Sequence, residues 1–299
     1  MFFTHKRIIT IDAGTSHTRT GDGKNLLFNE STVIEIDEKN KVVGFGKNTK
    51  TRTANKLIYP VNKAIGDFHA FEMMIRGIIK NYHTVKTWKL TTNIIVFALP
   101  SSVTEVEKRA FRDSAEHAGA VEVYMADSAI CVANSIGFLG KTKPYIIVDF
   151  GASKLDINGF HKGQKIHLES LDMGINQLKK LLTSEFDHLK EVDLDDIITS
   201  YRQSINSTEI DECIEGFVKI LKATIHHFKK TFLDTKSRQI VPQFAFVTGG
   251  GAIYQQMILD ALSPINCAIE FSKTPFTNVI DGLNMMADDL HHHKEFIQT

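Results

Sequence analysis

The stretch that decides the fold is IITIDAGTS at residues 8–16, and YIIVDFGAS at residues 145–153 repeats its pattern. Each stretch is an apolar, β-branched run that ends in an aspartate, followed after one residue by glycine and small residues. Such a run predicts a buried strand that leads into a tight turn. The two aspartates, Asp12 and Asp149, are 137 residues apart, about half the chain. We therefore predict a duplicated domain rather than a short-period repeat.

The repeated unit has the chemistry of a phosphate-binding turn. Successive backbone N–H groups in a turn of glycine and small residues form a nest for an anion. Two such turns facing each other would clasp a polyphosphate. Carboxylates are ligands for Mg²⁺, often through water, so Asp12 and Asp149 are candidate metal-binding residues. A pair of ordinary strand–turn hairpins is the alternative.

A third glycine turn follows a late apolar run, in FAFVTGGGAI at residues 244–253. We expect residues 252–262 to form a helix that stops before Pro264. Backbone N–H groups at the start of that helix would favour an anion or a polar edge of a ligand. This turn is therefore a further candidate for ligand binding.

Local signals place several other elements. An apolar stripe at helical spacing predicts a helix over residues 68–82. Thr104 and Glu107 have the spacing of a capping box, which predicts the start of a second helix. Residues 158–168 are expected to form a strand. Strands and helices alternate along the chain, so the fold class is α/β.

The composition is that of an ordinary globular chain of 299 residues, with 42% hydrophobic residues and a formal net charge of zero. The length suits two domains. The balanced charge indicates no direct nucleic-acid partner. Three widely spaced cysteines without a CxxC pair favour a reducing compartment over a disulfide framework or a zinc site. Because no signal peptide or membrane-spanning run is present, we expect a cytoplasmic protein.

The order of the three turns resembles the phosphate-one, phosphate-two and adenosine motifs of the actin superfamily. A finer similarity is to the MreB family of filament-forming bacterial actins. It is carried by LPSSVTEVEKRA at residues 99–110 and AGAVEVY at residues 118–124, with further support from residues 60–68 and 248–253. The similarity covers most of the chain except about residues 180–240.

The resemblance implies an actin-like ATPase fold, with two duplicated ribonuclease-H-like domains and a nucleotide cleft between them. The first domain is expected at residues 1–140, with a small outer subdomain at about residues 30–80. The second is expected at residues 141–299, with its C-terminal helix packing back on the first. No family motif is found between Leu178 and Lys236. The outer subdomain of the second half is therefore expected to be reduced.

Carried over position by position, the resemblance assigns residues to ATP and Mg²⁺. The first turn would line the phosphates with Asp12, Gly14, Thr15, Ser16 and His17. The second would do so with Asp149, Gly151, Ala152, Ser153 and Lys154. The adenosine side would be held by Gly249, Gly250, Gly251, Ala252 and Ile253. Asp12 and Asp149 would hold Mg²⁺ through water.

Two catalytic positions of the family are altered in this chain. The family's catalytic glutamate falls at Ser128, so the neighbouring Asp127 is a weak catalytic candidate. Its hydrolytic threonine falls at Lys154, which is either a fixed cation for a phosphate or a solvent-facing lysine. Removing one group that stabilises a transition state costs about 10²–10³ in rate. The resemblance thus implies at most a slow ATPase.

As a function, the resemblance implies a cytoskeletal protein that binds ATP and assembles into filaments of its own chain, for cell shape and wall-growth organisation. Family filaments lie on the inner membrane face, where wall-synthesis proteins are the partners. Phe2 and Phe3 are a candidate membrane contact, with a frayed terminus as the alternative. A nucleotide-independent scaffold and a plasmid-segregation filament remain open. So do a small-molecule kinase and a chaperone-type ATPase of the same fold.

Overall fold

A computed structural model describes residues 5–39, 41–49, 55–62, 64–82, 91–203, 205–235, 238–290, 293 and 297–298. The chain divides into two compact units. Unit 1 contains Met1–Gly137 and Val279–Thr299, and unit 2 is the continuous stretch Phe138–Asn278. The candidate membrane contact at Phe2 and Phe3 lies outside the described residues.

Unit 1 is built on a six-stranded sheet in the order β18-β10-β9-β1-β2-β3. Its strands are β1 (His5–Ala13), β2 (His17–Gly21), β3 (Leu26–Ser31), β9 (Thr91–Leu99), β10 (Ala120–Asp127) and β18 (Ile297–Gln298). The first apolar run of the sequence forms β1, which pairs in parallel with β9 and antiparallel with β2. The candidate turn at residues 14–16 therefore lies at the carboxyl end of a central strand.

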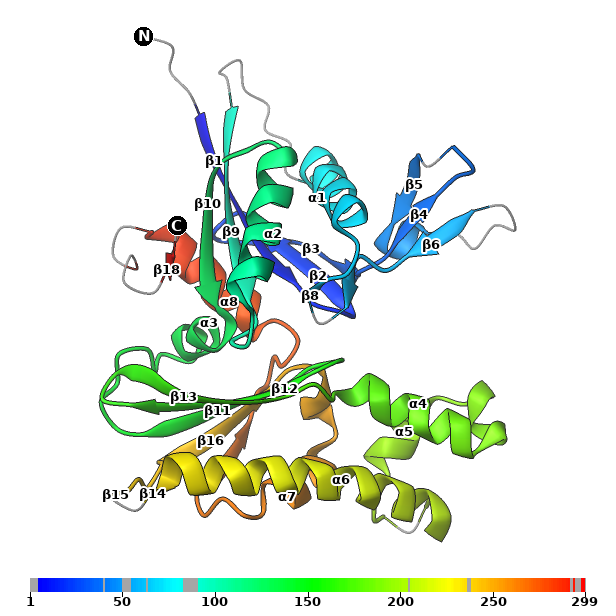
Figure 1. Cartoon of the computed structure of the whole chain (residues 1–299), viewed down its shortest axis with the longest axis vertical. Helices are drawn as coiled ribbons and strands as arrows, with labels where there is room; N and C mark the ends of the chain where they lie inside the picture. Colours follow the sequence, from blue (N-terminus) through cyan, green and yellow to red (C-terminus); the bar gives the residue numbers. More distant parts are fainter. Residues whose placement is uncertain are drawn as a thin grey trace. The chain divides into compact units, whose positions relative to one another are not determined.

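Helices cover both faces of this sheet (Figure 1). On one face α1 (Phe68–Tyr82) and α2 (Glu105–His117) pack against alternate residues of β1, including Ile9 and Ile11. On the other face lie α3 (Ser128–Ser135) and α8 (Asn278–Asp288). The predicted helix at residues 68–82 is confirmed, and so is the capping box that starts α2.

The C-terminal part of unit 1 is fixed to the sheet by close contacts. Thr10 on β1 donates a hydrogen bond from Oγ1 to Oδ1 of Asn284 on α8, at 2.5 Å. Gly282 lies so close to the carbonyl of Cys131 that any side chain there would collide with it. Strand β18 pairs antiparallel with the end of β10, where Ile297 is buried.

A smaller sheet belongs to the outer part of unit 1, in the order β5-β4-β6. Its strands are β4 (Ile34–Ile36), β5 (Val42–Phe45) and β6 (Lys56–Ile58). Three short elements complete the region: η1 (Gly46–Asn48), β7 (Val61–Asn62) and β8 (Ala64–Ile65).

Unit 2 repeats the central arrangement of unit 1 with a five-stranded sheet in the order β13-β12-β11-β16-β17. Its strands are β11 (Tyr145–Phe150), β12 (Leu155–His161), β13 (Gln164–Leu171), β16 (Phe244–Thr248) and β17 (Ala268–Phe271). Strand β11 pairs antiparallel with β12 and in parallel with β16, as β1 does with β2 and β9. The duplicated strand–turn–strand predicted from the two similar stretches is therefore present in both units.

The strand structure predicted at residues 158–168 is present but is interrupted by a reversal. These residues belong to the end of β12 and the start of β13, which are joined at Lys162 and Gly163. Both residues have positive φ, 54° and 79°. A two-residue turn of this kind reverses the chain tightly. Lysine rarely adopts a left-handed conformation, so the amino-acid sequence did not indicate a chain reversal here.

Helices make up the rest of unit 2. They are α4 (Ile175–Glu185), η2 (Asp187–Glu191), α5 (Leu194–Thr199), α6 (Thr208–Phe228), its π-helical continuation η3 (Lys229–Leu233), η4 (Gly250–Ile253) and α7 (Gln255–Leu262), with the short strands β14 (Asp234–Thr235) and β15 (Arg238–Gln239). Where they are described, residues 175–228 form helices and turns and no strand. The outer part of unit 2 thus lacks a sheet like β5-β4-β6, as the missing family motif predicts.

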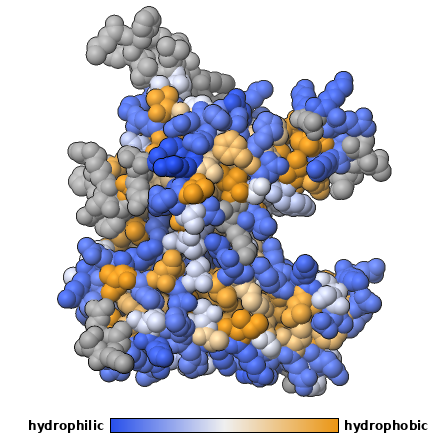
Figure 2. Space-filling model, viewed as in Figure 1, coloured by the Kyte–Doolittle hydropathy of each residue, from blue (hydrophilic) through white to orange (hydrophobic). Residues whose placement is uncertain are grey.

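The surface in Figure 2 is mainly hydrophilic, with hydrophobic residues in separate small patches. Within the described part of the chain, none of the helices has the length and apolar character needed to cross a membrane.

Candidate functional site

The first candidate turn joins β1 to β2 in unit 1. The N–H of Gly14 donates to the carbonyl of His17 at 3.0 Å, which closes the turn. Thr32 supports it from behind, because its Oγ1 donates to the carbonyl of Gly14 at 2.7 Å and its N–H donates to the carbonyl of Ser16 at 2.9 Å. The side chains of Ser16 and His17 are exposed and hydrogen-bonded to each other at 3.0 Å. The turn is therefore held from within the unit while two polar side chains face outward.

A guanidinium faces the aspartate at the end of β1. The strand register places Arg19 directly opposite Asp12, and Nη1 lies 3.4 Å from Oδ2. The two side chains are only 11% and 18% exposed. Burial raises the pKa of Asp12, and the charge of Arg19 opposes part of that shift. Burial and the charge of Arg19 together lower the pKa of His17.

The second candidate turn, between β11 and β12 in unit 2, has the same internal hydrogen bond. The N–H of Gly151 donates to the carbonyl of Lys154 at 2.8 Å. The start of α4 supports this turn, because the N–H groups of Ile175 and Asn176 donate to the carbonyls of Gly151 and Ala152, at 3.2 and 2.9 Å. A Cβ on Gly174 would lie 2.5 Å from the carbonyl carbon of Ala152, so only glycine fits there.

The charged groups around this second turn differ from those of the first. Asp149 lies opposite Asp156 on the return strand, and beside Thr248 on β16. Ser170 on β13 donates to Oδ1 of Asp156 at 2.5 Å. Lys154, whose side chain is only 17% exposed, lies 3.8 Å from Asp172. Of the two readings of Lys154, a solvent-facing lysine is therefore wrong.

These surroundings bear on whether Mg²⁺ fits the two aspartates. Magnesium prefers oxygen ligands and usually keeps several waters. In unit 2, Asp149 has Asp156 and Thr248 in register on the neighbouring strands, but the hydroxyl of Thr248 is fully buried and lies within hydrogen-bonding distance of Pro275 and Asn278. In unit 1, one carboxylate oxygen of Asp12 already faces a guanidinium. Among the described residues, no group of three or more His, Cys, Asp or Glu side chains is placed to hold a metal ion.

The third turn lies directly beside the second within unit 2. Gly249 has a positive φ of 84°, and a side chain there would collide with the carboxylate of Asp149. The predicted helix start at residue 252 is wrong, because Gly250–Ile253 form a 3₁₀ turn and α7 begins at Gln255. The N–H groups of Ala252 and Tyr254 are used inside this turn, by the carbonyls of Gly249 and Gly251. These two N–H groups are engaged within the turn, and the binding of an anion or a polar ligand edge at this turn stays a prediction.

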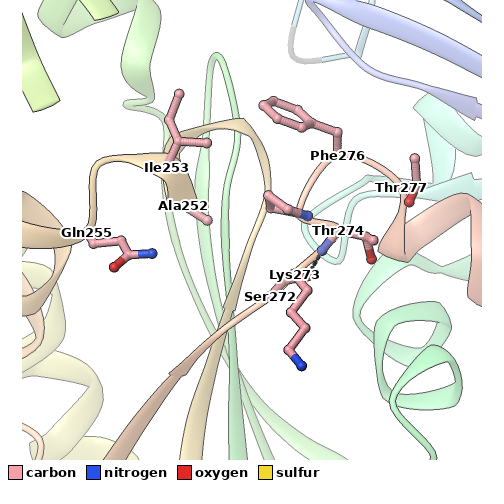
Figure 3. Close-up of a pocket in the computed structure, with 9 residues that line it drawn as sticks. Ala252, Ile253, Gln255, Ser272, Lys273, Thr274, Phe276 and Thr277 are labelled. Carbon is pink, nitrogen blue, oxygen red and sulfur yellow. Dashed lines mark hydrogen bonds between the residues drawn. The ribbon is translucent and has the colours of Figure 1, made fainter. Parts of the chain in front are cut away.

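A pocket of about 410 Å³ lies next to the third turn. Its lining is Ala252, Ile253, Gln255 and the stretch from Ser272 to Thr277 that follows β17. The N–H of Gly249 donates to the carbonyl of Pro275 at 3.1 Å, which ties the two segments together. Figure 3 shows Ile253 and Phe276 at one end of the pocket and the ammonium group of Lys273 at the other. Sequence reasoning named Ala252 and Ile253 but missed residues 272–277, which match no glycine or charge motif.

Asp127, the weak catalytic candidate, caps α3. Its Oδ1 accepts from the N–H of Ala129 and from the hydroxyl of Ser101, each at 2.8 Å. Ser128 is the buried first residue of that helix. An aspartate at an N-cap typically stabilises a helix by about 1 kcal/mol. This structural role accounts for Asp127, and its contact with a reacting water stays a prediction.

Comparisons with known proteins agree with these observations. The pattern of the MreB/Mbl protein family matches residues 6–191. The cell shape-determining protein Mbl of Bacillus subtilis is 22% identical over 323 residues, which cover 95% of this chain and 96% of Mbl. The cell shape-determining protein MreB of Escherichia coli is 26% identical over 179 residues, which cover 56% of this chain and 51% of MreB.

Solved structures are similar over almost the whole chain. Spiroplasma citri MreB5 bound to AMPPNP superposes with a TM-score of 0.77 at 20% identity, covering 97% of this chain and 98% of MreB5. The MamK double helical filament gives a TM-score of 0.75 at 15% identity, covering 95% of this chain and 99% of that one. These likenesses establish an actin-like fold, and the matching family pattern shows that the chain belongs to the MreB/Mbl family.

Proposed function

We propose that this chain is a cytoskeletal actin of the MreB type that binds ATP with Mg²⁺ and assembles into filaments of its own copies. The observation that carries the proposal is the repeated hairpin. In each unit an aspartate ends a central strand, and a glycine N–H closes the turn onto the carbonyl three residues later, at 3.0 and 2.8 Å. Turns of this kind present backbone N–H groups to an anion.

Within this proposal the residues divide by the part of ATP they contact. Residues 14–17 and 151–154 contact the phosphates, and Lys154 adds a positive charge beside the second turn. Mg²⁺, when bound, neutralises phosphate charge, and Asp149 holds it through water. Structures of the similar protein MreB5 were solved with AMPPNP and with ADP, which supports a nucleotide as the ligand.

The adenosine side is assigned to the pocket beside Gly249. Its volume of about 410 Å³ lies in the range of small-molecule sites, about 300–1,000 Å³. Ile253 and Phe276 are 37% and 47% exposed, so both present apolar surface that a base can cover. The amide of Gln255 supplies a polar group to the same pocket.

Hydrolysis is proposed to be slow. Ser128 and Lys154 stand where the resemblance places the family's glutamate and threonine, and neither replaces the group that orients a water. Ser128 is a buried residue at the start of α3, and Lys154 lies near Asp172. Turnover should be measurable only at long times, while binding persists.

The test of nucleotide binding is calorimetry with ATP and Mg²⁺, on the wild type and on Phe276→Ala. Stacking of a base on an aromatic ring contributes about 1–3 kcal/mol, so Phe276→Ala should weaken binding by at least about fivefold. Tyr59→Ala is the matched control, because Tyr59 is an aromatic residue of unit 1 that is 64% exposed and lies outside the pocket lining. Absence of ATP binding by the wild type at millimolar concentration would contradict the proposal and favour the nucleotide-independent scaffold.

Assembly is tested separately, by sedimentation and electron microscopy with ATP, with ADP and without nucleotide. The MamK neighbour forms a double helical filament, which supports self-association. We expect polymer with ATP, at the cytoplasmic membrane face and beside wall-synthesis proteins in the cell. If no polymer forms under any nucleotide, the filament part of the proposal is wrong even if ATP binds.

A further inference from the structure

The pairing of Arg19 with Asp12 is not explained by the turn motif. Arg19 is mostly buried on β2, opposite Asp12, with Nη1 3.4 Å from the carboxylate. Its Nε is also buried and has no hydrogen-bond partner among the residues that the structure describes. The guanidinium is therefore not saturated by the protein. It also acts on His17, two residues along the strand, whose pKa it helps to lower.

The charge balance at this turn follows from that geometry. An ionised carboxylate beside a polyphosphate repels it, and in many nucleotide sites a divalent cation lies between the two. Arginine stays charged at every physiological pH and carries five donors in a rigid fork that suits carboxylate and phosphate oxygens. Arg19 therefore already neutralises Asp12 before any metal ion arrives.

Unit 2 offers the internal contrast. Its equivalent aspartate, Asp149, faces a second carboxylate, Asp156, across the return strand. The return strand thus brings an arginine to the aspartate of the first hairpin and a second carboxylate to the aspartate of the second.

We propose that Arg19 is a built-in counter-cation of the first turn, which takes the place of a divalent cation bridging Asp12 to a nucleotide polyphosphate. The inference rests on the proposed binding of ATP and extends it. Its consequence is that removing Mg²⁺ weakens ATP binding only modestly, because the first hairpin keeps its own cation. Lys154, largely buried beside the second turn, adds a further fixed positive charge in unit 2.

The experiment is calorimetric titration of ATP into the full chain, once with Mg²⁺ and once with EDTA. For the wild type we expect the two affinities to differ by less than about tenfold. Arg19→Met keeps the unbranched stem and removes the charge. Since a charge-assisted hydrogen bond contributes enough for a change of about 10–100-fold, this variant should bind with Mg²⁺ but lose at least tenfold more than wild type in EDTA.

Two further variants separate charge from packing. Arg19→Lys keeps a cation and should retain binding in EDTA. Arg7→Met removes a partly buried arginine of β1 that donates to Asn93, and should leave the ratio of the two affinities unchanged. If Arg19→Met does not fold, as judged by circular dichroism and thermal denaturation, Arg19→Gln is titrated in its place.

The outcomes distinguish this inference from the proposed function. A wild type that binds ATP in Mg²⁺ but loses it in EDTA as steeply as Arg19→Met overturns the role of Arg19 and leaves nucleotide binding intact. A wild type that binds ATP under neither condition overturns the proposed function itself, and the role of Arg19 with it.

Discussion

The hairpins of unit 1 and unit 2 have the same turn, but the residues that face their aspartates carry side chains of opposite charge type. Arg19 faces Asp12, whereas Asp156 faces Asp149. In both turns the glycine N–H donates to the carbonyl three residues on, so the same hydrogen bond closes them. The comparison shows that glycine and strand pairing set the turn, while the return strand sets its charge independently.

The two turns also differ in what supports them. One side chain, Thr32, holds the carbonyl of Gly14 in unit 1. In unit 2 the start of a helix holds the turn, with Gly174 packed against its backbone. A side-chain hydrogen bond can be removed with little steric disturbance. A side chain added where backbone packs against backbone has no space, because neither backbone segment can move aside. The second turn is therefore more sensitive to substitution than the first.

The largest expected effect comes from Gly174→Ala. Its φ of −128° suits any residue, so the whole cost is the collision of the new methyl group with the backbone of Ala152. We expect a loss of about 3 kcal/mol in the free energy of unfolding, at the upper end of overpacking. Thr32→Val is the counterpart in unit 1, where loss of the hydrogen bonds from a buried hydroxyl should cost about 1–2 kcal/mol. Urea denaturation measures both, and equal losses would contradict the comparison.

An intermediate effect on the free energy of unfolding is expected when the charged side chains of Arg19 and Lys154 are replaced. Arg19→Met leaves the mostly buried Asp12 unpaired, which should cost about 2 kcal/mol, less than a fully buried pair because the contact is 3.4 Å long. Lys154→Met should change stability by no more than about 0.5 kcal/mol, because its partner Asp172 is 62% exposed. The same denaturation experiment compares them. A larger loss in Lys154→Met would show that the second hairpin, not the first, depends on its cation.

The smallest effect is a pH dependence confined to the first hairpin. The folded-state pKa of Asp12 is raised above its ordinary value of 3.8, so the folded chain holds this proton more tightly than the unfolded chain. Stability contributed by Asp12 is full below pH 3.8 and falls as the pH rises through the raised pKa. Asp12→Asn does not titrate, so wild type should lose stability relative to this variant across that window. Thermal denaturation at a series of pH values measures the difference, and a gain with rising pH would reverse the assignment.

Much of the two hairpins could be predicted from the sequence, because an apolar run followed by Asp-x-Gly predicts both the strand and the turn after it. The charge partner of Asp12 could not, since it depends on a register that brings together residues of two strands. The same limit hid the close approach of Gly249 to Asp149, which are 100 residues apart. The local sequence specifies a turn, but which side chains share a face of the sheet depends on how the strands pair.

The errors have similar causes. The reversal at Lys162 was missed because lysine seldom adopts positive φ. The helix after the third turn starts later than predicted because Gly250–Ile253 form a 3₁₀ turn ahead of it. Residues 272–277 lie beside the third turn, where the N–H of Gly249 donates to the carbonyl of Pro275, and nothing in their own sequence indicates this contact.

The return of the chain to unit 1 after Asn278 has a consequence for biosynthesis. Unit 2 is one continuous stretch and can close its core as soon as it leaves the ribosome. Unit 1 must wait, because α8 and β18, which cover one face and one edge of its sheet, are translated after all of unit 2. Until then the apolar surface around Cys131 stays exposed on the nascent chain, where a chaperone or another nascent chain can bind to it. The half that is made first is therefore the half that matures last.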